Sequence, residues 1–189
     1  MRRQLLGGLI AGLVTLGLSF SPAGAARDDQ TYGPDEITHA VSGFFGVTTE
    51  AAAKVVQHVF HDLGEPDAYI KGEEASGAFI GGLRYGSGVL VRKGGGGGKV
   101  YWRGPSIGFD VGGNASKCFT LVYNLRDSRT LFQRFPGVEG TIYFVAGISV
   151  NYMRTDGVTL APMRTGVGLR AGVNMQYEAF SRKREWFPL

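Results

Sequence analysis

Residues 77–91 read GAFIGGLRYGSGVLV, and this glycine-rich stretch decides the fold class. Its apolar and aromatic side chains are interrupted by glycine or polar residues with the two-residue period of a β-strand. Gly82, Gly86 and Gly88 fall on one face of the stretch and leave it nearly without side chains. A bare face lets strands curve sharply or lets neighbouring backbones approach closely. The stretch therefore predicts strands of a strongly curved sheet.

The same alternation continues along most of the chain after Pro66, and 31 of the 189 residues are glycine, without the repeat of collagen. Strand-like segments occupy residues 67–73, 75–93, 99–113, 117–125, 140–154, 157–164 and 165–180. One short helix is expected within residues 125–135, with Asp127 or Ser128 as its cap. Roughly eight strands would leave open edges unless the sheet closed on itself. We therefore predict an α+β fold containing a small closed or conical antiparallel β-barrel.

Two helices are predicted before the sheet. In residues 33–46, Pro34 suits a first helical turn, and Ile37, Val41, Phe44 and Phe45 fall on one face. Residues 48–66 form a second helix, in which Thr48 or Thr49 acts as the cap and Gly64 and Pro66 end the element. Its apolar stripe comprises Ala52, Val55, Val56, Val59, Phe60 and Leu63. The short connection predicts a helical hairpin packed on the barrel.

The N-terminus has the pattern of a cleavable signal peptide. Arg2 and Arg3 precede an apolar stretch, and residues 23–25 read AGA, which fits a small-x-small cleavage site. We expect a signal peptide over residues 1–25, a flexible segment over 26–33 and a single β-barrel domain over 34–189. The protein is then periplasmic and has no transmembrane span after cleavage. The sequence leaves open whether export uses the Sec or the twin-arginine route.

The mature charge balance is mild. The net charge is +4, and two of those charges come from the arginines of the signal segment. This balance does not indicate a nucleic-acid-binding protein. The single cysteine, Cys118, excludes an internal disulfide, and its strand-like neighbours predict a buried core residue.

The glycine run Gly94–Gly98 does not match a phosphate-binding loop. Lys93 stands where the first glycine of that motif belongs, and Val100 stands where its hydroxyl belongs. We interpret the run as the turn of a hairpin. His58 and His61 share a helix face but lack further ligands in the sequence, so no metal and no cofactor are expected.

Positive and aromatic residues gather around this hairpin. Such a mixture suits anionic lipid headgroups or glycans, but it is also common on a solvated barrel rim. The candidate ligand-binding residues are Arg84, Arg92, Lys93, Lys99, Tyr101, Trp102 and Arg103.

Two long runs resemble the EipA family of periplasmic envelope-integrity proteins. They read IKGEEASGAFIGGLRYGSGVL over residues 70–90 and YWRGPSIGFDVGGNASKCFTLVYNL over residues 101–125. The glycine-rich strand and Trp102-Arg103-Gly104-Pro105 more distantly resemble the SYLF lipid-binding domain. The resemblance implies a small conical barrel without known catalysis, a role in envelope integrity and, for SYLF relatives, binding of anionic phospholipids.

Two functional hypotheses follow. In the first, the protein is not an enzyme and supports the cell envelope by binding an anionic lipid, a glycan or another envelope protein. In the second, it is a cryptic hydrolase of cell-wall polymers, with carboxylates such as Asp110 and Glu139 as acid and base.

Overall fold

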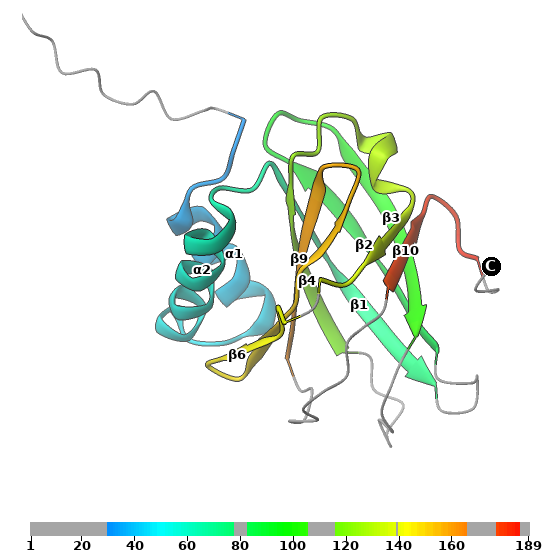
Figure 1. The fold of residues 1–189 in the computed structure, drawn as a ribbon. Coiled ribbons are helices and arrows are strands. Elements are labelled where there is room, and N and C mark those ends of the chain that lie inside the picture. Colours follow the sequence, from blue (N-terminus) through cyan, green and yellow to red (C-terminus); the bar gives the residue numbers. More distant parts are fainter. Residues whose placement is uncertain (1–29, 78–82, 106–115, 139, 166–176, 186–189) are drawn as a thin grey trace, which may run out of the picture.

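The computed structural model describes residues 30–77, 83–105, 116–138, 140–165 and 177–185. Two helices precede a curled antiparallel sheet, as the sequence predicts (Figure 1). The helices are α1 (Pro34–Phe45) and α2 (Thr49–Leu63), and η2 (Ser128–Leu131) is a 3-10 turn. The strands are β1 (Ala68–Gly77), β2 (Leu83–Arg92), β3 (Gly97–Pro105), β4 (Ser116–Tyr123), β5 (Arg134–Pro136), β6 (Tyr143–Val145), β7 (Ile148–Val150), β8 (Met153–Thr155), β9 (Val158–Thr165) and β10 (Tyr177–Ser181).

The caps predicted for α2 and for the short helix near residue 128 are present, and α1 begins at the predicted proline. Pro34 begins α1, and the Glu36 carboxylate accepts a hydrogen bond from the Gly33 amide at 3.1 Å. The Thr48 hydroxyl accepts from the Ala51 amide at 3.2 Å, and α2 ends at Gly64. Asp127 caps the 3-10 turn by accepting from the Arg129 amide at 2.8 Å.

The described strands form one ten-stranded sheet whose order is β5-β10-β3-β2-β1-β4-β9-β7-β6, with β8 also paired to β9. Every pairing between them is antiparallel. The curl brings β5 to β8, where Gly137 and Met153 form an isolated antiparallel bridge. The Val138 amide also donates to the Tyr152 carbonyl at 2.9 Å. These contacts join the two sides of the curled sheet into a barrel.

Three predicted boundaries differ from the structure. The predicted strand over 75–93 covers both the end of β1 and all of β2, and residues 78–82 lie outside the described part. Residues 140–154 contain β6, β7 and the start of β8 rather than one strand. The chain turns between β6 and β7 through Ala146 and Gly147, whose φ angles are 51° and 81°, and residues 151 and 152 separate β7 from β8. The helix predicted within 125–135 is only the 3-10 turn, and β5 follows at once.

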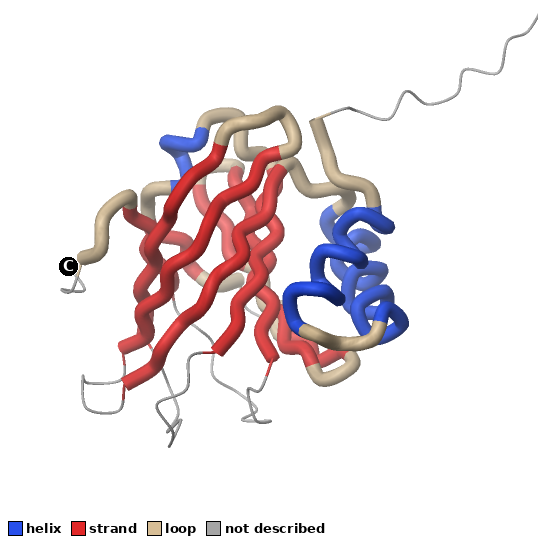
Figure 2. Tube along the Cα trace, turned by 180° about the vertical axis from the view of Figure 1, so that it is seen from behind, coloured by secondary structure: helices blue, strands red, loops and turns tan. Residues whose placement is uncertain are grey.

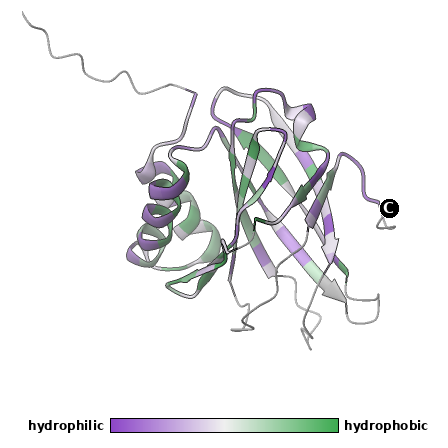
Figure 3. Ribbon diagram, in the orientation of Figure 1, coloured by the Kyte–Doolittle hydropathy of each residue, from purple (hydrophilic) through white to green (hydrophobic). Residues whose placement is uncertain are grey.

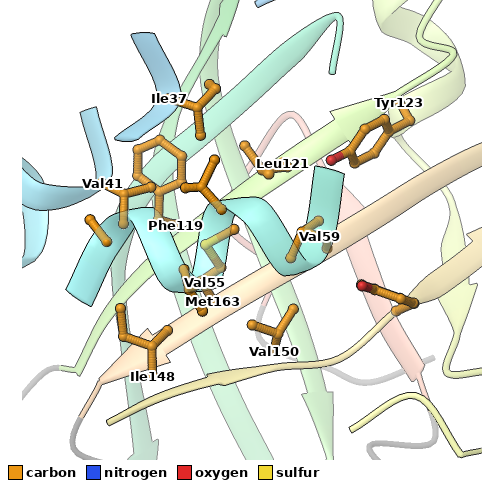
Figure 4. Close-up of a cluster of buried hydrophobic side chains, with 14 residues drawn as sticks. Ile37, Val41, Val55, Val59, Phe119, Leu121, Tyr123, Ile148, Val150 and Met163 are labelled. Carbon is orange, nitrogen blue, oxygen red and sulfur yellow. The ribbon is translucent and has the colours of Figure 1, made fainter. Parts of the chain in front are cut away.

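The hydrophobic core has two parts. The helices pack against the outer face of β4, β9 and the β6–β7 hairpin, with their hydrophobic residues toward the sheet (Figure 3; close-up in Figure 4). The completely buried residues of this layer include Ile37, Val41, Val55, Val59 and Phe119. The Tyr152 hydroxyl adds a polar link by donating to Asp62 Oδ2 of α2 at 2.7 Å.

The second part fills the barrel with side chains. It consists of Ala68, Ile70, Leu90, Val100, Trp102, Cys118, Val122, Leu125, Leu131, Phe135, Met153, Val158, Leu160 and Phe180. Glycine makes this packing possible at Gly86, where an added Cβ would lie 2.0 Å from Cε2 of the Trp102 indole. The bare face predicted for the glycine-rich stretch is therefore occupied by an aromatic ring from the neighbouring strand.

Candidate functional site

Strand β3 separates the predicted site residues by alternation. Val100 and Trp102 face the barrel interior and are 1% and 3% exposed, whereas Lys99 and Tyr101 lie on the outer face. The sequence places Tyr101 beside Trp102, but successive side chains of a strand point to opposite faces. The seven predicted residues therefore do not form one patch, and the structure distributes them over three places.

The first place is the outer face of β3, β10 and β5, on the side of the barrel away from the helices (Figures 1 and 2). Register places Arg103 and Arg134 on either side of Ala179, and Tyr101 opposite Ser181. We call this outer surface the basic wall; it consists of Lys99, Tyr101, Arg134, Tyr177 and Arg184 around Arg103, which is only 8% exposed.

Cations of the basic wall lie over aromatic rings. Lys99 Nζ is 5.4 Å and Arg184 Cζ is 5.9 Å from the centroid of the Tyr101 ring. Arg134 Cζ lies 5.0 Å from the Tyr177 centroid in the same geometry. The Arg103 guanidinium forms an ion pair with Glu185 at 2.5 Å. The residues that follow β10 thus return across the outer face of β3.

The second place is the predicted turn between β2 and β3, formed by residues 93–96, while Gly97 and Gly98 of the glycine run already belong to β3. Arg92 donates to the Leu125 carbonyl at 2.8 Å, which ties this turn to the segment before η2. Lys93 pairs with Glu36 at 2.5 Å and lies 4.9 Å from the Tyr32 ring centroid. Both side chains connect distant parts of the chain and lie apart from the basic wall.

The third place is inside the barrel, at the end where β1, β3 and β9 finish. Arg84 from β2 reaches Glu74 Oε1 at 3.5 Å and Glu178 Oε1 at 3.8 Å. Trp102 donates its indole N–H to Glu74 Oε2 at 3.2 Å. Arg84 and Trp102 therefore contact a buried cluster of charged side chains that the sequence patterns did not indicate.

Arg164 is at the centre of this cluster. Its Nε donates to Glu74 Oε1 at 2.6 Å, its Nη2 to Glu74 Oε2 at 3.3 Å, and the same Nη2 contacts Glu178 Oε1. Its Nη1 donates to the Asn151 side-chain carbonyl at 3.2 Å. Glu74, Arg164 and Glu178 are 4%, 3% and 1% exposed. We call Glu74, Arg84, Arg164 and Glu178 the interior charge cluster.

The two carboxyls of the cluster are in different electrostatic states. Burial alone would raise the pKa of Glu74, but Arg164, Arg84 and the donated hydrogen bonds outweigh burial and bring that pKa below its ordinary value. For Glu178, burial dominates and the pKa lies above the ordinary value, although both arginines oppose this shift. Burial likewise raises the pKa of the Cys118 thiol to about 12, so this cysteine is the inert core residue predicted.

Strand alternation could have identified the cluster. Glu74, Arg164 and Glu178 each stand where the two-residue period of the strand points inward, beside residues that the period places in the core. A charge at an inward position is unusual unless a partner is also buried. The partners come from strands that are far apart in the sequence, so the period gives the direction of each side chain but not the pairing.

Other kinds of site find little support in the part of the chain that the structure describes. There, no group of three or more His, Cys, Asp or Glu side chains is placed to hold a metal ion. No helix among the described residues is long and apolar enough to cross a bilayer. Asp110 and Glu139, the carboxylates considered for hydrolysis, lie outside the described residues.

The fold defines a class, namely small α+β proteins with a filled antiparallel barrel and an N-terminal helical hairpin. The family model of EipA, envelope integrity protein A, matches residues 30–189, and the chain belongs to that family. A crystal structure of a β-barrel-like, uncharacterized protein from Brucella abortus is similar, with 44% sequence identity and a TM-score of 0.78. The similarity covers 85% of this chain and 99% of that chain. No curated protein gives a significant match.

Proposed function

We propose that the protein is a non-catalytic, exported component of the cell envelope whose basic wall binds anionic phospholipid headgroups. The family description, envelope integrity protein A, supports the envelope role. The signal-like residues 1–25 support a periplasmic location.

One observation carries the choice of ligand: cations of the basic wall are stacked against tyrosine rings on the barrel side that the helices leave uncovered. A tyrosine presents an apolar ring and a polar hydroxyl, which suits the headgroup region of a membrane. Lysine and arginine beside it attract phosphate, at about 1 kcal/mol for each cation near an anionic surface. A glycan or another envelope protein would be the alternative occupant of the same surface.

The hydrolase hypothesis has less support. Such a reaction needs two carboxyls roughly 5–10 Å apart, on either side of a bond in an accessible cleft. Among the described residues, Glu74 and Glu178 share a site, but both are buried and both contact Arg164. Because both carboxyls are buried and paired with Arg164, they are not placed to reach a polymer. We therefore propose a binding function rather than catalysis.

Vesicle co-sedimentation tests the proposed function. The purified protein should bind vesicles that contain phosphatidylglycerol in preference to neutral vesicles, and added salt should weaken the binding. The double variant Lys99→Gln/Arg134→Gln should bind roughly 10- to 30-fold more weakly, since it loses two cations of the basic wall. The control Lys54→Gln/Lys117→Gln removes the same charge on the side of the helices, where Lys117 contacts α1, and should bind like the wild type.

Equal binding of the wild-type protein to neutral and anionic vesicles would contradict the proposal. Binding to an anionic polysaccharide in the absence of vesicle binding would assign the basic wall to a glycan. An equal loss in both double variants would mean that the net charge, rather than the basic wall, drives adsorption.

A further inference from the structure

The interior charge cluster contains two carboxyls that face the same two guanidiniums, those of Arg84 and Arg164, but accept different numbers of hydrogen bonds. Glu74 accepts hydrogen bonds from Arg164 Nε and Nη2 and from the Trp102 indole, so both of its oxygens have donors. Glu178 uses only Oε1, which contacts Arg164 and faces Arg84. Its other oxygen, Oε2, is buried and has no hydrogen-bond partner among the described residues.

The groups facing Glu178 come from several strands. Arg84 of β2 and Arg164 of β9 are the cations, and Glu74 of β1 is the nearest anion. Cys118 of β4 is a further titratable group in electrostatic contact with the cluster, and its thiol is neutral at physiological pH. From β3, the backbone at Gly104 lies against Glu178, where an added Cβ would be 3.5 Å from the glutamate Cγ.

The difference in the number of hydrogen bonds accepted by Glu74 and Glu178 determines which of the two carboxyls binds a proton. An ionised carboxylate loses its hydration when it is buried, and each donated hydrogen bond offsets part of that loss. Glu74 recovers the loss through its donors, whereas an ionised Glu178 would have an unpartnered, negatively charged oxygen inside the barrel. A neutral carboxyl loses much less hydration on burial. Two nearby carboxyls in unequal surroundings commonly divide in this way into one charged and one protonated group.

We propose that Glu178 is a buried proton-binding site of the folded barrel, with the proton on its Oε2 oxygen while Glu74 stays ionised. The cluster then contains two arginines, one carboxylate and one neutral carboxyl. Raising the pH sufficiently removes this proton and places a second negative charge in the barrel interior. The inference is independent of the ligand proposed for the basic wall.

The direction of the pKa shift agrees with this geometry and fixes the expected pH dependence. The pKa of Glu178 lies above its ordinary value, chiefly because of burial. A raised pKa means that the folded protein binds the proton more tightly than the unfolded chain does. The resulting stabilisation is complete below the ordinary glutamate pKa of about 4.3, and it is lost as the pH rises through the folded value.

Carboxyl NMR on the full wild-type protein tests the inference directly. With carbon-13-labelled glutamate and resonances assigned through the backbone, Glu178 should titrate above about pH 4.3, and Glu74 should titrate below it. A Glu178 carboxyl that titrates at or below about pH 4.3 would overturn the proposal.

Urea unfolding of wild type and Glu178→Gln is the second measurement, because glutamine is neutral at every pH, as the protonated glutamate is. As the pH rises above about 4.3, the equilibrium constant for folding of the wild type should decrease relative to that of the variant. The decrease should reach up to about tenfold per pH unit until the pH exceeds the pKa of Glu178 in the folded protein. A constant or reversed difference would contradict the proposal. If the Glu178→Gln variant does not fold, the carboxyl NMR titration of the wild-type protein tests the proposal by itself.

Discussion

Arg164 and Arg134 lie on strands of the same sheet but have different partners. Arg164 faces inward, is 3% exposed and is held by two glutamates and an asparagine. Arg134 faces outward, is exposed and lies over a tyrosine ring. Burial makes carboxylate partners necessary inside the barrel, because a buried charge without a partner is very costly. On the outer face, water hydrates the charge of Arg134, so this cation needs no carboxylate partner and remains able to interact with a ligand.

Replacing Glu74 should have a large effect on stability and would test whether the interior cluster stabilises the barrel. Glu74→Gln leaves Arg164 and Arg84 with less compensating charge in the interior, and we expect a loss of about 3–5 kcal/mol in the free energy of unfolding at neutral pH. The pKa of Glu74 is lowered in the folded protein, so its stabilisation is present above about pH 4.3 and is lost as the pH falls through the folded value. Urea unfolding at several pH values measures both effects.

The matched control for that variant is Glu73→Gln. It changes the neighbouring glutamate in β1, which is exposed on the outer face, and should alter stability by less than about 0.5 kcal/mol. Similar losses in the two variants would show that the buried and exposed positions do not differ as the structure implies.

Gly86→Ala should have an intermediate effect. The new Cβ would lie 2.0 Å from the Trp102 indole, so the ring must move and its hydrogen bond to Glu74 is disturbed. We expect a loss of about 1–3 kcal/mol, measured by thermal or urea unfolding, as for other overpacked cores. Gly43→Ala in α1 is the control, because nothing lies within 4 Å of its added Cβ and alanine favours a helix. A neutral Gly86 variant would mean that the barrel interior has room for a larger side chain.

Tyr101→Ala should have a small effect on stability and would test the difference between the two faces of β3. Its side chain lies on the outer face, so unfolding should change by less than about 1 kcal/mol, while binding to anionic vesicles weakens. Trp102→Ala, one residue further along, should cost about 3–5 kcal/mol because it leaves a cavity in the core. Tyr101→Ala should therefore weaken vesicle binding more than it lowers stability, and Trp102→Ala should do the reverse. Equal effects of the two variants on stability and on vesicle binding would contradict the assignment of these side chains to opposite faces of β3.

Local sequence patterns were sufficient for much of the fold. The caps of α2 and η2, the inward stripes of both helices and the alternation of the long strands are properties of neighbouring residues, and the structure agrees with them. Patterns were less successful at residues 140–154, where a tight turn at Ala146 and Gly147 interrupts an apparently continuous strand. For the site, composition around the β2–β3 hairpin suggested one patch, but the alternation of β3 assigned Tyr101 and Trp102 to opposite faces.

The sequence by itself determined the helical hairpin, the antiparallel strands and the small side chains that let them curl, because each depends on residues within a few positions of one another. Only the tertiary structure decided which inward charges meet. Glu74 and Arg164 are 90 positions apart, and closure of the barrel brings β1, β2, β9 and β10 around a common interior. The state of each carboxyl follows from that meeting, because hydration, neighbouring charge and donated hydrogen bonds are properties of the assembled site rather than of the chain.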